Sequence, residues 1–251
     1  MPADHRRILI LGGTGEARRL AVQAIETLPN NVEVISSYAG RTARLQNPPG
    51  TVREGGFGGA HGLANYMRDA AIDMVIDATH PFAAAISDHA ATAASATGRP
   101  RLILRRPDWQ LPKEAQTTFV SDMATAARQL ATRGGRAFLS TGIQELGAFS
   151  RIPNVWFLVR LISEPQESLP LDSYDVVFGR PPFSQTEEAL LLRENRIDML
   201  VSKHSGGPLP KKIIAAVNQN IPLTLIRQPS MPYGAYVETI DDAIAWIQDR
   251  L

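Results

Sequence analysis

The stretch ILILGGTGEARRLA, residues 8–21, begins with four aliphatic residues, continues through a glycine-rich turn and ends in a pattern with helical spacing. The run from Ile8 to Leu11 is apolar at every position, which is typical of a parallel strand buried on both faces. Beyond the turn, Ala17, Leu20 and Ala21 recur at the spacing of one helix face. The stretch therefore predicts a strand, a tight turn and a helix. Because backbone N–H groups at the start of such a helix bind anions, we expect a phosphate there.

The turn itself consists of Gly12, Gly13, Thr14, Gly15 and Glu16. It lacks the third glycine of the dinucleotide fingerprint G-x-G-x-x-G, so the match to that fingerprint is loose. A turn of this kind also occurs as a plain connection between a strand and a helix, and that alternative stays open at this point.

The composition is that of a soluble globular protein. The chain has 251 residues, a formal net charge of +1 and no cysteine. The small net charge argues against a nucleic-acid partner, and the lack of cysteine excludes disulfides, thiolate metal sites and cysteine nucleophiles. No metal-ligand cluster is visible either. Because no apolar run reaches the length of a membrane span and no signal peptide is present, we expect a cytoplasmic protein without a membrane partner.

Strand and helix patterns alternate along the whole chain, which predicts an α/β protein with parallel sheets flanked by helices. Residues 105–117 contain prolines and no periodicity, and we interpret them as a linker. We therefore expect two Rossmann-like lobes, residues 1–110 and 111–251, with a ligand cleft between them. The expected strands are 7–11, 32–36, 51–53, 74–78, 102–104, 118–120, 136–140, 155–161, 175–178, 199–202 and 223–226. The expected helices are 16–28, 60–71, 82–97, 122–132, 143–149, 184–194, 211–218 and 241–248.

The end of the second expected strand carries no carboxylate. In a dinucleotide fold, an acidic residue at this place favours the 2′-hydroxyl of NAD. Here the strand continues into SSYAGRT, in which Ser37, Tyr38 and Arg41 offer hydroxyls and a guanidinium. These groups suit a 2′-phosphate, so NADP is favoured over NAD if a dinucleotide binds. The alternative is that Arg41 is an ordinary surface residue after a turn.

Two further motifs follow expected strands of the first lobe. Residues 53–63, REGGFGGAHGL, place two glycine pairs around Phe57, which suggests a loop that passes close to a flat group. At residues 79–81 the strand ends in Thr79, His80 and Pro81, and Pro81 is suited to the first position of a helix with His80 or Thr79 as its cap. Since parallel sheets bind ligands at the carboxyl ends of their strands, His80 is a candidate functional residue.

The second lobe has a counterpart in MLVSKHSGGP, residues 199–208. Lys203 follows a strand there, beside a histidine and the run Ser205, Gly206 and Gly207. These groups could bind phosphate or carboxylate and donate a proton. Two more strand ends, STGIQEL at 140–146 and FGRPPFS at 178–184, are weaker candidates for ligand contact.

In their order and spacing, the motifs ILILGGTGEARRLA, YAGRT, GGFGG, VIDATHPFA, RRPDW and VSKHSGG closely resemble the precorrin-6A reductase family of cobalamin biosynthesis. The resemblance covers nearly the whole chain. It implies an oxidoreductase that acts on a CH–CH group and uses NADPH to reduce a double bond of the macrocycle, converting precorrin-6A or its cobalt-bearing equivalent to the 6B form. The substrate partner is then a tetrapyrrole with many carboxylates, and the resemblance allows transient contacts with neighbouring pathway enzymes.

The resemblance also implies roles for the residues singled out above. His80 and Lys203 are the candidate catalytic proton donors, and delivery of the proton by solvent is the alternative. The candidate cofactor-binding residues are Gly12, Gly13, Thr14, Gly15, Glu16, Ser37, Tyr38, Arg41, Thr79, Ser205, Gly206 and Gly207. Because the turn lacks a fingerprint glycine, part of this set could contact the substrate instead.

Two other kinds of protein remain as alternatives. A non-catalytic two-lobed α/β protein that binds an anionic ligand would use the same strand-end turns. An NADP-dependent reductase of a small carbonyl would want a tyrosine and a lysine about four residues apart on a helix, and neither Tyr66 nor Tyr236 has such a lysine.

Overall fold

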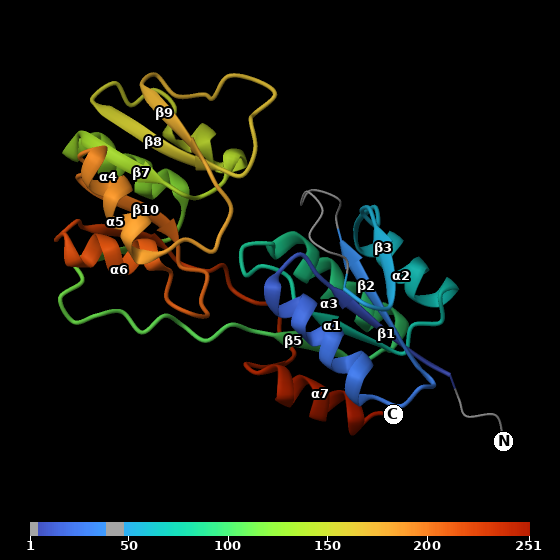
Figure 1. Cartoon of the computed structure of the whole chain (residues 1–251). Coiled ribbons are helices and arrows are strands. Elements are labelled where there is room, and N and C mark those ends of the chain that lie inside the picture. The colour runs from blue at the N-terminus through green and yellow to red at the C-terminus, as the bar shows by residue number, and fades with distance from the viewer. Residues whose placement is uncertain (1–4, 39–47) are drawn as a thin grey trace. The chain divides into compact units, whose positions relative to one another are not determined.

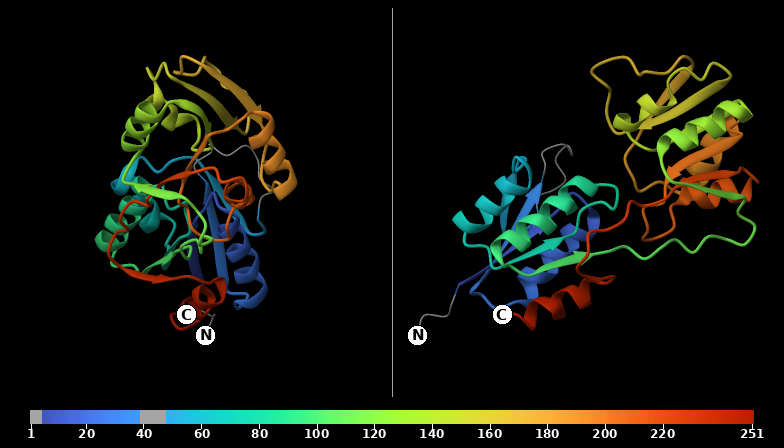
Figure 2. Two further views of the ribbon diagram at one scale, coloured as in Figure 1. Left: turned by 90° about the vertical axis from the view of Figure 1, so that its left-hand side faces the viewer. Right: turned by 180° about the vertical axis from the view of Figure 1, so that it is seen from behind.

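The computed structural model describes residues 5–38 and 48–251, and these residues form two six-stranded sheets whose neighbouring strands run parallel (Figure 1). The chain forms two compact units, the first Met1–Pro107 with Pro229–Leu251 and the second Asp108–Gln228. Helices flank each sheet, as two further views make visible (Figure 2). The expected α/β class with Rossmann-like parallel sheets is therefore confirmed.

In the first unit the strands lie in the order β3-β2-β1-β4-β5-β12. This is the order of a dinucleotide-binding sheet, with its topological switch point between β1 and β4. The elements of this unit are β1 (Arg6–Leu11), α1 (Gly15–Thr27), β2 (Val32–Tyr38), β3 (Thr51–Glu54), α2 (Gly59–Asp69), β4 (Met74–Asp77), α3 (Ala84–Thr97), β5 (Arg101–Leu104), β12 (Ala235–Val237) and α7 (Ile240–Gln248).

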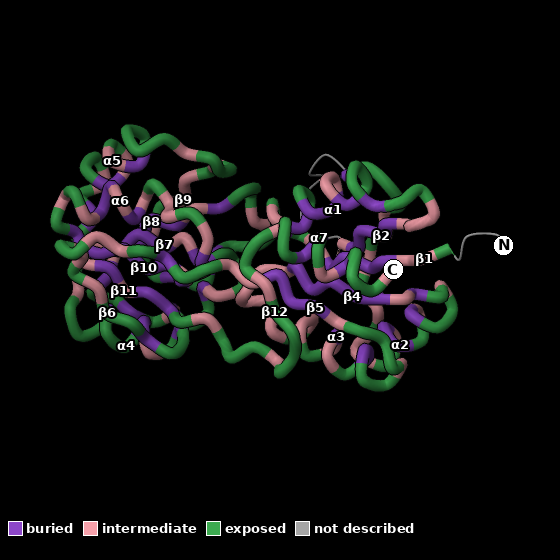
Figure 3. Tube along the Cα trace, turned by 90° about the horizontal axis from the view of Figure 1, so that it is seen from below, coloured by how far each residue is buried: buried purple, intermediate pink, exposed green. Residues whose placement is uncertain are grey.

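Side chains alternate between two cores on the two faces of this sheet. Ile8 and Ile10 of β1 pack with α1 and α7, whereas Leu9 and Leu11 pack with α2 and α3. All four residues are at most 2% exposed, and the central strands are coloured as buried in Figure 3. A strand covered on both faces needs apolar residues at every position, which explains the unbroken ILIL run.

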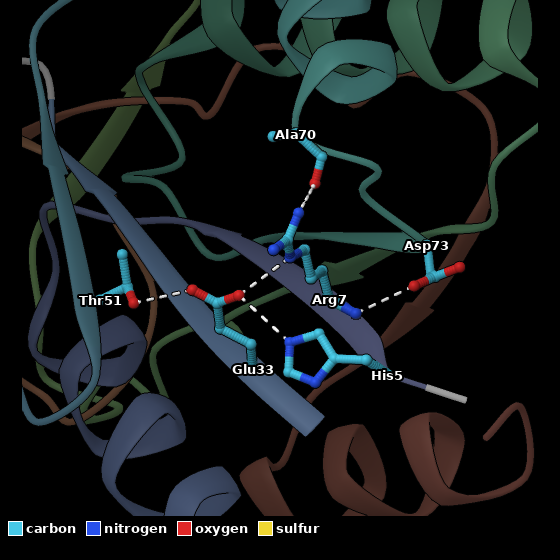
Figure 4. A network of polar contacts seen from close by, with 6 residues as sticks. All are labelled: His5, Arg7, Glu33, Thr51, Ala70 and Asp73. Atoms are coloured by element: carbon cyan, nitrogen blue, oxygen red, sulfur yellow. Dashed lines mark hydrogen bonds and ion pairs between the residues drawn. The ribbon is translucent and has the colours of Figure 1, made fainter. Parts of the chain in front are cut away.

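Ion pairs stabilise the amino end of the same sheet (Figure 4). Arg7 donates from Nε to Glu33 at 2.9 Å and from Nη1 to the Ala70 carbonyl oxygen at 2.9 Å. The Arg7 backbone N–H donates to Asp73, and the Thr51 hydroxyl donates to Glu33, each at 2.9 Å. The Thr51 hydrogen bond is the largest cause of the lowered pKa of Glu33. At this edge the arginine charge is thus balanced by carboxylates, which identifies a structural network.

The second unit repeats the topology with the order β6-β11-β10-β7-β8-β9, so its switch point lies between β7 and β10. Its elements are β6 (Thr117–Val120), α4 (Met123–Arg133), β7 (Gly135–Leu139), η1 (Ile143–Phe149), β8 (Val155–Leu161), β9 (Tyr174–Phe178), α5 (Gln185–Glu194), β10 (Met199–Lys203), α6 (Lys211–Asn218) and β11 (Leu223–Ile226). Phe138 and Leu200 of this sheet pack with α5 and α6. Phe157 faces the other side, where its ring lies 6.0 Å from that of Phe149 in η1.

The C-terminal part of the chain returns to the first unit. β6, directly after the linker, pairs with β11 in the second unit, while β12 near the C-terminus pairs with β5 in the first. Residues 229–251, expected in the second lobe, therefore belong to the first unit, although the other division at 107/108 lies close to the expected boundary. The reason is hydrophobic: Ala243, Ile244 and Ile247 of α7 complete the core that α1 begins.

Most elements agree with the expected ranges, with three differences. The sequence does not predict β12. This strand has only three residues and Tyr236 in it is 53% exposed, so its side chains show no alternation of apolar and polar positions. Residues 143–149 form a 3-10 helix. The expected start of α3 at Phe82 is wrong: the helix begins at Ala84, and its N-cap residue Ala83 makes no side-chain capping bond.

Across the described residues, no helix combines the length and the apolar character that a membrane span requires.

Candidate functional site

The glycine turn of the first unit lies at the carboxyl end of β1, beside the switch point. The Gly12 N–H donates to the Ser37 carbonyl oxygen at 2.9 Å, which ties the turn to the end of β2. Gly13 has a φ of 107°, a conformation that L side chains rarely adopt. A Cβ built on Gly13 or Gly15 would meet nothing within 4 Å. The backbone at this turn is therefore open to a ligand.

Thr14 holds the turn in place through two hydrogen bonds of its side chain. It is 6% exposed, and its Oγ1 caps α1 by accepting from the Ala17 N–H at 3.1 Å. The same hydroxyl donates to the Ala78 carbonyl oxygen at 2.8 Å, so the turn is joined to the residue that follows β4. One side chain thus positions the two strand ends that form the switch point.

Glu16, a candidate cofactor residue, is held by arginines. Its carboxylate forms ion pairs with Arg106 at 2.6 Å and with Arg19 at 3.2 Å. These cations compensate the negative charge at the start of α1. An anion at the turn therefore does not face an unbalanced carboxylate.

The end of β2 brings Ser37 and Tyr38 to the same edge. Ser37 is 5% exposed, and the Tyr38 ring would lie 3.1 Å from a Cβ on Gly12, so the glycine turn and Tyr38 are close neighbours. Burial raises the pKa of Tyr38, which keeps its hydroxyl protonated. Arg41, the expected partner of a 2′-phosphate, lies outside the described residues.

Arg53 is a basic residue at this place that the sequence reasoning missed. In the β2–β3 ladder it stands opposite Ser37, and its Nη1 lies 3.4 Å from Ser37 Oγ. The guanidinium donates to the carbonyl oxygens of Gly55 at 2.6 Å and Gly56 at 3.0 Å, and it stacks 3.7 Å above the Phe57 ring. Within the described ranges no carboxylate pairs with it. Arg53 is thus a firmly held cation whose charge is not balanced, in contrast to Arg7 at the opposite edge.

A signal for Arg53 exists in the sequence, but it is weak. In its motif, REGGFGG, the glycines and Phe57 are the residues that suggest a ligand-binding loop. The strand in front of the motif is only four residues long. The register that brings Arg53 beside Ser37 is set by parallel pairing across 16 residues of chain, which periodicity alone does not reveal.

Thr79 and His80 follow β4 directly. Asp77, 2% exposed, accepts at Oδ1 from the Thr79 N–H at 3.2 Å and from the Thr79 hydroxyl at 2.7 Å. His80 Nδ1 accepts from the Phe82 N–H at 3.2 Å. The expectation that Pro81 begins α3 with His80 or Thr79 as its cap is wrong, because these residues form a separate turn before the helix. A neutral His80 ring that accepts at Nδ1 carries its proton at Nε2.

The candidates of the second unit gather at the end of β10. Lys203 Nζ donates to Glu145 Oε1 at 2.8 Å, which joins the end of β10 to η1. The Ser205 N–H donates to the Lys203 carbonyl oxygen at 3.0 Å, and Gly206 and Gly207 both have positive φ, 67° and 81°. This turn lies at the switch point of its own sheet.

His204, which lies between Lys203 and Ser205 in the chain, is packed among aromatic side chains. It is 8% exposed, and its ring lies 4.8 Å from Trp109 and 5.5 Å from Phe119, both edge to face. Burial is the main cause that lowers its pKa, and the opposing effect of Asp108 is smaller. His204 is therefore a core residue that anchors the linker residue Trp109.

The site candidates thus form two groups, one in each unit. In the first unit, the turn 12–16, Ser37, Tyr38, Thr79 and His80 share the carboxyl edge of one sheet, and Arg53 joins them. In the second unit, Lys203, Ser205, Gly206 and Gly207 occupy the corresponding edge of the other sheet. The open glycine backbone, the capped helix start and the unbalanced guanidinium of the first unit fit a phosphate-bearing ligand.

The family model "Precorrin-6x reductase CbiJ/CobK" matches residues 7–248. A precorrin-6A reductase of Rhodococcus erythropolis is 46% identical over 245 residues, with 96% of this chain and 97% of the relative covered. A precorrin-6A reductase of Mycobacterium tuberculosis is 41% identical over 244 residues, with 96% and 97% covered.

A solved structure described as CobK precorrin-6A reductase superposes with a TM-score of 0.90 at 37% identity, with 98% of this chain and 97% of that chain covered. The resemblance inferred from the ordered motifs is therefore confirmed, and so is the fold class. With the family model and these relatives matching almost from end to end, this chain belongs to the CbiJ/CobK family of precorrin-6x reductases.

Proposed function

We propose that the protein reduces precorrin-6A to precorrin-6B in cobalamin biosynthesis, with NADPH as the hydride donor. As a member of its family the chain is an oxidoreductase that acts on a CH–CH group, and such a reductase needs a reducing cofactor. Membership of this family also argues against a protein that only binds an anionic ligand.

The observation that carries the cofactor proposal is the carboxyl edge of the first sheet. Its strand order is that of dinucleotide-binding folds, and the open glycine turn and the start of α1 suit a pyrophosphate. At the end of β2, where NAD-binding folds carry an acidic residue, this unit has Ser37 with Arg53 opposite it. A hydroxyl and an unbalanced guanidinium favour a 2′-phosphate over a bare ribose hydroxyl.

Reduction of the double bond adds a hydride and a proton across it, and bound NADPH supplies the hydride. The chain must then orient the reactants and deliver one proton. We assign Thr79 and His80 to the nicotinamide end, because they follow β4 at the switch point. His80 is one candidate proton donor through Nε2–H, and Lys203 is the other. Gly12 to Glu16, Ser37 and Tyr38 remain the proposed cofactor set, and Ser205, Gly206 and Gly207 remain proposed ligand contacts.

Binding of NADPH and NADH to the wild type and to Arg53→Gln tests the cofactor assignment. We expect the wild type to prefer NADPH, and the variant to lose about tenfold or more of that preference, since a hydrogen bond to a charged group contributes about 1.5–3 kcal/mol. NADH affinity should change little. Nicotinamide fluorescence in an equilibrium titration gives both dissociation constants.

Arg68→Gln is the matched control, because Arg68 is an exposed arginine on α2 that contacts Asn65. Arg41→Gln tests the sequence-based expectation in parallel. Equal affinity of the wild type for the two nucleotides would contradict the NADPH assignment, and an unchanged preference in Arg53→Gln would remove Arg53 from it.

A further inference from the structure

A cluster of charged residues, of which Glu188 is buried and Arg160 and Lys212 are half-buried, lies at the carboxyl edge of the second sheet, on the face covered by α5 and α6. Arg160 of β8 donates to Glu188 of α5 through two parallel bonds of 2.7 Å each. The Glu188 side chain is 3% exposed and the Arg160 side chain 12%. Lys212, the second residue of α6, donates from Nζ to the Ser140 hydroxyl at 2.6 Å, where β7 has just ended.

The charges of this cluster do not balance. Arg160 and Lys212 contribute two positive charges, and Glu188 contributes one negative charge that the guanidinium already engages on both oxygens. Glu187 also acts on Arg160, but it is exposed and its carboxylate accepts from the Ser184 N–H in the capping box of α5. A half-buried cation without its own counter-charge is less well solvated than one in water, and the cluster as a whole carries one more positive than negative charge.

Two further observations concern polar groups of this cluster and of the residue next to Ser140. Desolvation by burial lowers the pKa of Lys212 to about 8, and the attraction of Glu188 opposes this shift without cancelling it. Thr141, which follows Ser140 directly, is 6% exposed, and its Oγ1 is buried without a hydrogen-bond partner in the described part of the chain. The ammonium group of Lys212, whose pKa is lowered, therefore contacts Ser140, and the unsatisfied hydroxyl belongs to the next residue, Thr141.

The location also favours a ligand. β7 and β10 flank the switch point of the second sheet, and doubly wound sheets bind their ligands outside the strand ends at such a point. Lys203, whose own charge is paired with Glu145, ends the adjacent strand β10.

We propose that Lys212, with Ser140 and Thr141, forms an oxyanion site in the second unit that binds one peripheral carboxylate of the tetrapyrrole substrate. The carboxylate supplies the missing negative charge and accepts hydrogen bonds from the ammonium group and the two hydroxyls. This inference rests on the proposed function for the identity of the ligand. Lys212 is thereby a substrate-binding residue that the sequence motifs did not reveal.

The test is a titration with precorrin-6A, without NADPH, of the wild type and of Lys212→Met, followed by the visible absorbance of the macrocycle. We expect the dissociation constant to rise about tenfold or more in Lys212→Met and to stay near the wild-type value in Lys212→Arg, which keeps the charge. The neighbouring exposed residue provides the control Lys211→Met, which should bind like the wild type. The NADPH affinity should be the same in all four proteins.

Each of the other outcomes contradicts either the inference about Lys212, the choice of a carboxylate as its ligand, or the proposed function. Unchanged binding of precorrin-6A by a folded Lys212→Met overturns the inference and leaves the proposed function intact. Weaker binding of NADPH instead of precorrin-6A assigns the oxyanion to a cofactor phosphate and overturns the carboxylate assignment. If the wild type binds no precorrin-6A, the proposed function fails and the inference fails with it.

A measurement on the unaltered chain avoids dependence on the folding of a variant. At pH 8 an amine-selective acylating reagent labels each lysine, and peptide mass spectrometry gives the rates at Lys212 and Lys211. We expect precorrin-6A to slow the labelling of Lys212 severalfold and to leave that of Lys211 unchanged. Equal rates at Lys212 with and without precorrin-6A would overturn the proposal.

Discussion

At Lys212, desolvation disfavours the protonated ammonium group, whereas the nearby Glu188 carboxylate favours it. Its pKa is lowered from 10.5 to about 8 by desolvation, with Glu188 and Arg160 as the charged neighbours and Ser140 as the hydrogen-bond acceptor. In the folded chain the protonated form is therefore disfavoured. The same residue is thus unfavourable for stability at neutral pH, which is typical of a group retained for binding.

This conflict predicts a pH-dependent stability difference. Between about pH 8 and pH 10.5 the unfolded chain keeps the Lys212 proton while the folded chain releases it, so this group raises the free energy of unfolding as pH rises. Lys212→Met should therefore be more stable than the wild type at pH 7 by on the order of 1–3 kcal/mol, with the gain fading toward pH 10.5. Urea unfolding at several pH values measures it, and parallel pH profiles for the two proteins would contradict it.

Among the elements, α2 and the loop before it are in close contact, and this contact requires a glycine at position 62. Gly62 lies in the first half of α2, and a Cβ there would overlap the carbonyl oxygen of Phe57. The loop thus packs directly on the helix, and it carries the two carbonyl oxygens, of Gly55 and Gly56, that hold Arg53. The REGGFGG motif therefore serves to position a guanidinium, in addition to any contact of Phe57 with a ligand.

We expect Gly62→Ala to displace this loop. The overlap is with backbone, which cannot yield as a flexible side chain would, so the cost in stability should be about 1–3 kcal/mol. NADPH affinity should fall as Arg53 loses its position. Gly56→Ala is the control, since a Cβ at Gly56 meets nothing within 4 Å and its φ is not in the positive range. Thermal unfolding and NADPH titration are the measurements, and equal behaviour of both variants would refute the role of Gly62.

For the whole molecule, the return of residues 229–251 to the first unit determines which fragments of the chain contain a complete core. The first unit needs β12 and α7, whose Ala243 and Ile247 are fully buried in its core. The second unit is one continuous segment, Asp108–Gln228, which includes its own edge strand β6. A division of the chain near residue 110 therefore leaves one piece without part of its core.

Two fragments test this arrangement. Residues 108–228 should fold cooperatively, with the near-ultraviolet circular dichroism of packed Trp109, whereas residues 1–110 should lack a cooperative unfolding transition because α7 and β12 are missing. Adding a 229–251 peptide should restore structure to the 1–110 fragment. A fragment 1–110 that unfolds cooperatively by itself would contradict the assignment of α7 to the first core.

Local sequence patterns are sufficient to predict most helices and strands and to indicate the family. The ILIL run, the helical spacing of Ala17 and Leu20 and the glycine turn are local signals, because side-chain periodicity reports which face of an element is buried. Tertiary structure alone decided the rest. β12 pairs with β5 across more than 130 residues. Lys212 of α6 donates a hydrogen bond to Ser140, which follows β7, and is influenced by the charge of Glu188 in α5. Such contacts arise because distant segments pack against a shared core, and the packing of these segments, not the neighbours in the chain, determines how far a charge is desolvated.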